Sequence, residues 1–297
     1  MAPPTDPSRR EQDRVDEAVD ETFPASDAPS WSPTHLGGTP RRPTLEQPHD
    51  VRAALRIDVE RLTRLASERE NIVARAMLDA GRSVMREPAP GLSPARNLEC
   101  EMRGGAEEPC VVVAARYDAD DVSGVAVMLS VLRALQAART RRTVRFVALA
   151  SSSAVGAYVE RLHAEGAHVH GMLSLARADL ARAAARGGRR PPAARLLVVG
   201  DLRAAPMVRA VRDAVRAESW IPVRALYLPA WLQRDGETAP AMRRLNERWP
   251  VVTITDGSPW RRVRAEPSLV EPDVDHMAAA VPGIAAAIVR LAGGRVR

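Results

Sequence analysis

Apolar residues recur at helical spacing in several segments of the chain, separated by polar or proline-rich stretches. Between residues 51 and 65 the repeat places its apolar side chains on one helix face, and it consists of Val51, Leu55, Val59, Leu62 and Leu65. The predicted helices cover 51–65, 70–79, 123–138, 154–165, 207–217 and a last segment that starts near 273. Pro282 lies inside the last segment, so a kink or a break is expected there.

Short apolar runs alternate with these helices and predict strands. The run 110–115 is apolar throughout, which is typical of a strand buried on both faces of a parallel sheet. The predicted strands are 97–102, 110–115, 143–150, 170–175, 196–200, 223–228 and 251–255. This alternation predicts an α/β fold with a mostly parallel central sheet that is covered by helices on both faces.

The first 48 residues have a different pattern and predict a disordered tail, with the folded domain at 49–297. Pro, Ser, Thr, Asp and Arg dominate the tail, which therefore has little apolar area to bury. Residues 21–31, which contain Phe23 and Trp31, resemble a short ETFPASDPPSW-type motif of small bacterial proteins. The two aromatic residues are suited to anchoring a peptide or protein partner. The alternative is that they fold back on the domain.

Composition narrows the choice of partners and of compartment. All 43 basic residues are Arg, and the net charge of +6 would suit nucleic acid. The Arg residues are spread along the whole chain without a basic block, so nucleic-acid binding is not favoured. No apolar signal core and no window of about 18 uncharged apolar residues is present, so we expect a cytoplasmic protein without membrane contact.

The two cysteines, Cys100 and Cys110, exclude a disulfide scaffold and a CxxC metal site. They flank a turn expected at 104–105, so a cross-strand approach is conceivable. Two buried thiols in a reducing cytosol are the favoured interpretation.

Four segments resemble the M28 peptidase family, the di-zinc aminopeptidases, in order and spacing across residues 51–293. They are Val111–Ala126 (VVVAARYDADDVSGVA), Arg142–Ser153 (RTVRFVALASSS), Gly171–Ala176 (GMLSLA) and Trp249–Asp256 (WPVVTITD). The resemblance implies the zinc-aminopeptidase-like, phosphorylase/hydrolase-type α/β sandwich. In such open sheets, chemistry collects at the carboxyl ends of the strands.

The same resemblance implies that most zinc ligands have been lost. The positions of the five family ligands hold Arg116, Asp120, Ser153, Ala176 and Arg264, and the general base is replaced by Ser152. Of these, only Asp120 retains a group that coordinates zinc, since Arg stays protonated and a methyl group has no lone pair.

We therefore expect a non-catalytic pseudopeptidase with a binding role and no cofactor. The alternative is an aberrant but active metallo-aminopeptidase that uses zinc, and the third hypothesis is an anion or nucleic-acid binder. At the vestigial cleft, Arg116 with Arg262 and Arg264 beside Asp118, Asp120 and Asp121 predicts either a salt-bridged plug or an anion pocket.

Other catalytic mechanisms have weak support in the sequence. Ser151, Ser152 and Ser153 lack a GxSxG elbow and a positioned base, so they are interpreted as small residues that cap the next helix. His163, His168 and His170 precede or begin a strand, which places them at its amino end, opposite the expected site.

Overall fold

The computed structural model describes residues 48–88, 95–106, 109–119, 121–176, 195–229, 248–256 and 272–294. The tail predicted for residues 1–48 lies almost wholly outside these ranges, together with Phe23 and Trp31. The division between the tail and the domain stays a prediction.

An eight-stranded mixed sheet forms the centre of the domain, in the order β1-β2-β4-β3-β5-β8-β6-β7. The strands are β1 (Val84–Pro88), β2 (Arg96–Met102), β3 (Cys110–Arg116), β4 (Val144–Leu149), β5 (Val169–Leu175), β6 (Leu196–Gly200), β7 (Val223–Tyr227) and β8 (Val251–Thr255). The four central strands β4, β3, β5 and β8 are parallel. Antiparallel pairing occurs outside them, between β1 and β2, between β2 and β4, and between β8 and β6.

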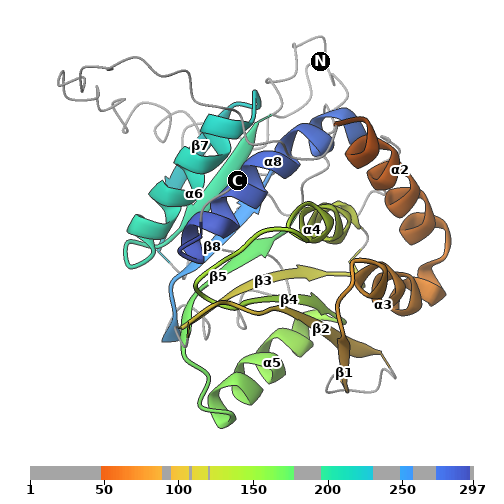
Figure 1. Ribbon diagram of the computed structural model, residues 1–297, viewed down its shortest axis with the longest axis horizontal. Coiled ribbons are helices and arrows are strands. Elements are labelled where there is room, and N and C mark those ends of the chain that lie inside the picture. The colour runs from red at the N-terminus through yellow and green to blue at the C-terminus, as the bar shows by residue number, and fades with distance from the viewer. Residues whose placement is uncertain are drawn as a thin grey trace, which may run out of the picture. The chain divides into compact units, whose positions relative to one another are not determined.

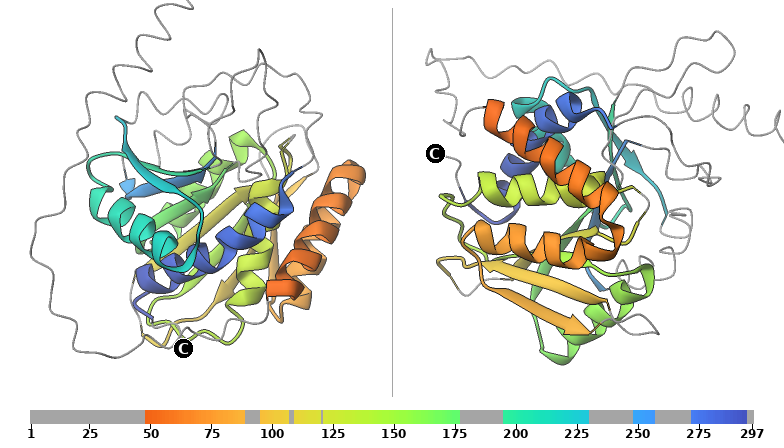
Figure 2. Two further views of the ribbon diagram at one scale, coloured as in Figure 1. Left: turned by 90° about the horizontal axis from the view of Figure 1, so that it is seen from above. Right: turned by 90° about the vertical axis from the view of Figure 1, so that its right-hand side faces the viewer.

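Helices cover both faces of this sheet, which confirms the predicted α/β fold class (Figure 1). One face carries α2 (Pro48–Arg64), α3 (Arg69–Asp79), α4 (Ser123–Ala134), α6 (Ala205–Glu218) and α8 (Val274–Leu291), with the short 3-10 turn η1 (Ala66–Glu68) between α2 and α3. The other face carries α5 (Ser152–Ala164). Figure 2 shows α2 and α3 as neighbouring helices beside α4.

The central strands supply both cores because their side chains alternate. On β3, Val111 and Val113 join the larger core under α4 and α8, whereas Val112 and Ala114 join the smaller core under α5. This double burial explains why the strand is apolar from Cys110 to Ala115, before it ends at Arg116.

Helix α8 has the length and the apolar composition of a helix that crosses a membrane. In this structure 56% of its most apolar window is buried inside the domain, and its apolar residues belong to the larger core. The feature is therefore explained by packing against α4 and α6. Pro282 lies within the helix without ending it, so the predicted alternative of a break is wrong.

Most predicted elements form within a few residues of their expected bounds. Two elements differ from the prediction. Helix α4 ends at Ala134 rather than 138, although Leu135 continues the apolar pattern and is buried in the following turn. The edge strand β1 was not predicted, because Val84–Pro88 is mostly exposed and carries charged residues in place of an apolar run.

The sheet order also decides how the cysteines lie. Cys100 pairs in register with Phe146 of β4, and Phe146 pairs on its other side with Val113 of β3. Strand β4 therefore lies between the two cysteine-bearing strands, and the cross-strand approach is wrong. Both thiols are buried and free, as the favoured interpretation states.

Candidate site at the carboxyl edge of the sheet

The parallel strands β4, β3, β5 and β8 end at a common edge, which we call the carboxyl edge. Residues that follow these strands meet there because parallel neighbours in register end side by side. Arg116 ends β3, Ser151 lies two residues beyond β4, Ala176 follows β5, and Asp256 follows β8. Helices α4 and α5 begin at the same edge, so this is where the vestigial zinc site was expected.

Arg116 forms a bidentate ion pair with Asp118 at this edge. Its Nε donates to Oδ1 of Asp118 at 2.9 Å, and its Nη2 donates to Oδ2 at 3.0 Å. Both side chains are roughly one-third exposed, at 29% and 32%. Two parallel N–H···O bonds fix the guanidinium plane as well as the charge. Arg116 is therefore paired with a neighbouring carboxylate, which is the arrangement that the salt-bridged plug predicts for this residue.

Arg69, the first residue of α3, forms hydrogen bonds to the loop from β3 to α4. Its Nη1 donates to the carbonyl oxygens of Tyr117 at 3.3 Å and Ala119 at 2.9 Å, and its Nε donates to the carbonyl of Leu62. The Tyr117 hydroxyl donates to the carbonyl of Arg96 at 2.8 Å, and burial raises the pKa of Tyr117 to about 12. These bonds attach the loop to α2, α3 and β2 and fix the position of the segment before α4.

Ser151 caps helix α5 and is not placed as a nucleophile. Its Oγ accepts a hydrogen bond from the amide of Ala154 at 3.1 Å and lies 2.9 Å from the Oγ of Ser153. Buried Asn97 of β2 fixes the same junction, because its Oδ1 accepts from the amide of Ala150 at 3.1 Å. Thus the capping interpretation is confirmed for Ser151.

The methyl side chain of Ala176 cannot ligate a metal ion. The backbone of Ala176 packs closely against two neighbouring segments. Its amide donates to the carbonyl of Ile254 at 3.1 Å, which ties the ends of β5 and β8 together. The first turn of α4 packs directly on this segment at Gly124. A Cβ at Gly124 would lie 2.1 Å from the carbonyl oxygen of Ala176 and 2.5 Å from that of Leu175. Only glycine fits this contact.

The structure places three of the predicted site residues at the carboxyl edge: Arg116, Ser153 and Ala176. The backbone of Ser152 lies there too, in the first turn of α5. Asp120 and Arg264 lie outside the described residues, as does Arg262. Their predicted parts in the plug or the pocket therefore stay predictions.

Comparisons with known proteins identify the scaffold. No protein-family model and no curated protein sequence matches the chain. The structure is similar to LapB from Legionella pneumophila, with a TM-score of 0.61 at 13% identity over 83% of this chain and 72% of LapB. The LapA aminopeptidase of the same organism matches with a TM-score of 0.59 at 13% identity, over 89% of this chain and 79% of LapA. The fold is that of the zinc aminopeptidases.

A third structure matches this chain over almost all of its own length. The Zn-dependent exopeptidase from Parabacteroides distasonis matches with a TM-score of 0.55 at 12% identity, over 82% of this chain and 98% of that protein. The zinc-aminopeptidase fold is therefore shared almost from end to end of that exopeptidase. The identities of 12–13% establish the fold only.

The described residues do not fit a pair of zinc ions in this zinc-aminopeptidase fold. Zinc requires thiolate, imidazole or carboxylate donors at about 2.0–2.3 Å. Within the described ranges, no three His, Cys, Asp or Glu side chains converge as a metal site would require. Arg116 brings a permanent positive charge to the position where the M28 resemblance implies a ligand, and it lies against Asp118.

Among the histidines whose side chains the structure describes, none belongs to a group that could hold a metal ion. His163 is in the last turn of α5, and His168 and His170 are at the start of β5, so all three are at the opposite edge of the sheet, as predicted. His276 is in the first turn of α8, where its Nδ1 lies 2.6 Å from Oδ2 of Asp273. The ring of Trp220, which is 68% exposed, tilts against His276 at 4.9 Å between centroids.

Sequence reasoning missed two groups of side chains. One is His276 with Asp273 and Trp220, and the other is a network of charges under α5. In the network, Arg161 of α5 pairs with buried Glu99 of β2 and with Glu87 of β1, and Arg145 of β4 pairs with Glu101. The available signal was the alternation of Glu99 and Glu101 in β2, which puts two carboxylates on one face. Without the strand order, the sequence does not show which arginines face these two carboxylates.

Proposed function

We propose that this protein is a non-catalytic relative of the zinc aminopeptidases that binds a peptide or protein partner at the carboxyl edge. The observation that carries the proposal is the bidentate pair between Arg116 and Asp118. It stands where the M28 resemblance implies the first zinc-binding histidine. A guanidinium has no lone pair to offer a cation, and its charge repels one.

Loss of the general base supports the same proposal. The resemblance puts Ser152 and Ser153 at the positions of the base and a ligand. A serine hydroxyl accepts a proton from water far less readily than a carboxylate does at neutral pH. Loss of a general base alone lowers a rate by about 10²–10⁴-fold. The Oγ of Ser153 lies beside the helix-capping Ser151, with no basic side chain joined to this serine pair by a hydrogen bond within the described residues.

A peptide is the proposed class of ligand because the structural neighbours are peptidases, which act on peptides. Arg116 remains partly exposed and could exchange Asp118 for a carboxylate of the ligand. Phe23 and Trp31 of the tail form the second proposed contact with a protein partner. The proposed compartment is the cytoplasm, and neither a membrane nor nucleic acid is part of the proposal.

A hydrolysis assay tests the absence of catalysis. The purified full-length chain is incubated with a panel of aminoacyl p-nitroanilides, with and without added zinc, beside LapA from Legionella pneumophila as the active control. We expect no zinc-dependent release of p-nitroaniline above the protein-free rate. Turnover that rises with zinc and is abolished by a chelator would instead establish the alternative, an aberrant metallo-aminopeptidase.

A binding assay tests the proposed role. A library of short peptides is titrated against the chain, with Arg116→Gln as the test variant. Arg216→Gln is the control, since Arg216 is exposed on the last turn of α6. Loss of one charge-assisted contact should weaken binding about tenfold in the Arg116 variant alone. Equal affinity in both variants would contradict a binding site at Arg116.

A further inference from the structure

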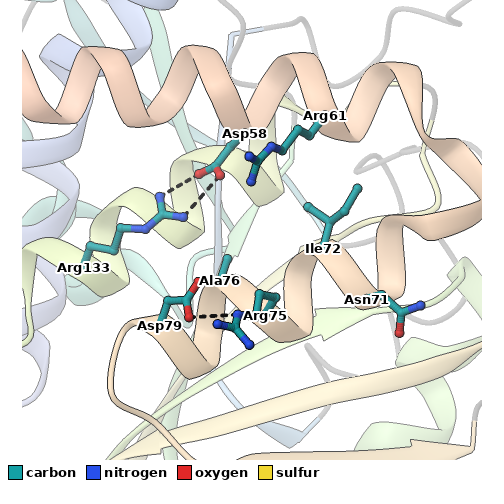
Figure 3. Close-up of a pocket in the computed structure, with 8 residues that line it drawn as sticks. All are labelled: Asp58, Arg61, Asn71, Ile72, Arg75, Ala76, Asp79 and Arg133. Atoms are coloured by element: carbon teal, nitrogen blue, oxygen red, sulfur yellow. Dashed lines mark hydrogen bonds and ion pairs between the residues drawn. The ribbon is translucent and has the colours of Figure 1, made fainter.

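A cavity of about 250 Å³ lies between helices α2 and α3, with the last turn of α4 as its inner wall. Figure 3 shows Asp58 and Arg61 extending from α2, Ile72 and Arg75 from α3, and Arg133 entering from α4. Asn71, Ala76 and Asp79 complete the lining. This cavity does not include any residue of the proposed peptide-binding edge, so the inference drawn from it does not depend on the proposed function.

The inner wall of the cavity is electrically neutral. Arg133 donates to both carboxylate oxygens of Asp58, at 2.6 and 3.2 Å, and the Asp58 side chain is only 8% exposed. A buried carboxylate held by two charge-assisted hydrogen bonds is a fixed structural pair. The Arg133 side chain is 29% exposed, but its charge and that of Asp58 cancel at short range.

The outer part of the cavity carries an excess of positive charge. Arg61 is exposed, and no carboxylate of the described residues lies within ion-pair distance of its guanidinium. Arg75 pairs with Asp79 one turn along α3, at 3.0 Å, but both side chains are mostly exposed, at 77% and 58%. Pairs of this kind are weak and exchange readily. Two guanidinium groups from opposite helices are thus open to an anion.

The remaining lining sets the size and character of the ligand. Ile72 is partly buried and Ala76 is buried, so the floor between the arginines is apolar. The amide of Asn71 is exposed at the same cavity and adds one further hydrogen-bonding group. A carboxylate or phosphate matches the planar fork of arginine, and a short apolar body matches the floor.

We infer that the cavity between α2 and α3 binds a small oxyanion-bearing molecule, a carboxylate or a phosphate, through Arg61 and Arg75. Arg61 supplies the uncompensated charge. Arg75 joins by releasing Asp79, which competes with the ligand for the same guanidinium. The two sources of the oxyanion, an organic acid and a phosphate, are distinguished by the probe that binds.

Calorimetric titration with sodium phosphate and with sodium succinate tests this inference, with sodium chloride at equal ionic strength as the reference. We expect saturable binding of at least one probe, weakened about tenfold by Arg61→Gln. Arg64→Gln is the matched control, because Arg64 lies on the same helix outside the cavity and pairs with Glu60. It should bind like the natural chain.

Asp79→Asn gives a second test in the opposite direction. Removing the competing carboxylate frees Arg75, so affinity for the same probe should rise in this variant. Both substitutions replace exposed side chains, and far-UV circular dichroism verifies that the variants fold. Two results would overturn the inference: no probe binds better than chloride, or Arg61→Gln and Arg64→Gln bind equally well.

Discussion

Two residues at the carboxyl edge, Arg116 and Gly124, have different parts in the proposed account. Arg116 stands where the M28 resemblance implies a zinc ligand, and it pairs with Asp118 two residues away. Gly124 keeps the close approach of α4 to the end of β5, where backbone oxygens leave no room for a side chain. In the proposed function Arg116 contacts the ligand, whereas Gly124 allows helix α4 to pack on the end of β5.

Gly124→Ala should therefore destabilise the protein strongly. The added methyl group meets backbone oxygens at 2.1 and 2.5 Å, which cannot move as a flexible side chain does. Overpacking of this kind costs about 3 kcal/mol of unfolding free energy or more, beyond the gain of up to about 1 kcal/mol from helix propensity. Urea denaturation followed by circular dichroism measures the difference.

The control is Gly156→Ala in α5, where nothing lies within 4 Å of the added Cβ. This variant should be as stable as the natural chain or slightly more stable. If the two alanine variants unfold at the same urea concentration, the close contact at Gly124 is not as tight as described.

The two cysteines should be unreactive while the protein is folded. Burial raises the pKa of Cys100 to about 12 and also raises the pKa of Cys110, so very little thiolate is present at pH 8. Labelling with Ellman's reagent at pH 8 should be slow in buffer and fast in urea. Rapid labelling of either thiol in the native protein would contradict this prediction, because it would show that the strand bearing the thiol opens or is exposed.

At the scale of elements, charges hold the edge hairpin to the rest of the sheet. Arg161 of α5 pairs with Glu99 of β2 and lies 2.9 Å from Glu87 of β1, so one side chain links a helix to two strands. It also lies over the ring of the buried Tyr158, at 4.9 Å. Burial raises the pKa of Glu87 in spite of this pairing, because desolvation outweighs the attraction to Arg161.

The raised pKa of Glu87 gives a pH dependence with a definite sign. The folded protein binds the proton of Glu87 more tightly than the unfolded chain does, so Glu87 favours the folded state most at acid pH. This contribution is lost as the pH rises through the folded-state pKa, above the ordinary value of 4.5. The free energy of unfolding of Glu87→Gln should therefore increase relative to that of the natural chain as the pH is raised from about 4 to about 7.

Unfolding free energies of both proteins across this pH range test the prediction, with Glu60→Gln on the exposed face of α2 as a control. A difference between Glu87→Gln and the natural chain that stays constant with pH would contradict it. So would a difference that favours the natural chain increasingly toward neutral pH.

The elements also show what a single sequence can and cannot predict. The sequence predicts strand β3 because burial on both faces leaves an apolar run from Cys110 to Ala115, whereas the exposed edge strand β1 has no such run. The strand order was not predictable, because β4 inserts between β2 and β3 through pairings distant in sequence. For this reason the sequence left open a cross-strand approach of Cys100 to Cys110, which the strand order excludes, and the network around Arg161 was missed.

At the scale of the whole molecule, the fold and the candidate site depend on different sets of residues. The core preserves the zinc-aminopeptidase fold at 12–13% identity to its structural neighbours. The site depends on a few side chains at strand ends, and motif positions in the sequence located Arg116, Ser153 and Ala176 at that edge. The sequence did not reveal the cavity between α2 and α3, since Asp58 and Arg133 are 75 positions apart and meet only through helix packing.

The metal content of the protein tests the central claim most directly. The full-length chain is incubated with excess zinc, freed of unbound metal by gel filtration and analysed by plasma emission spectroscopy, with the Zn-dependent exopeptidase from Parabacteroides distasonis treated in parallel. We expect substoichiometric zinc in this protein and retained zinc in the exopeptidase. Two zinc ions per chain, retained through gel filtration and released with loss of peptidase activity, would contradict the account.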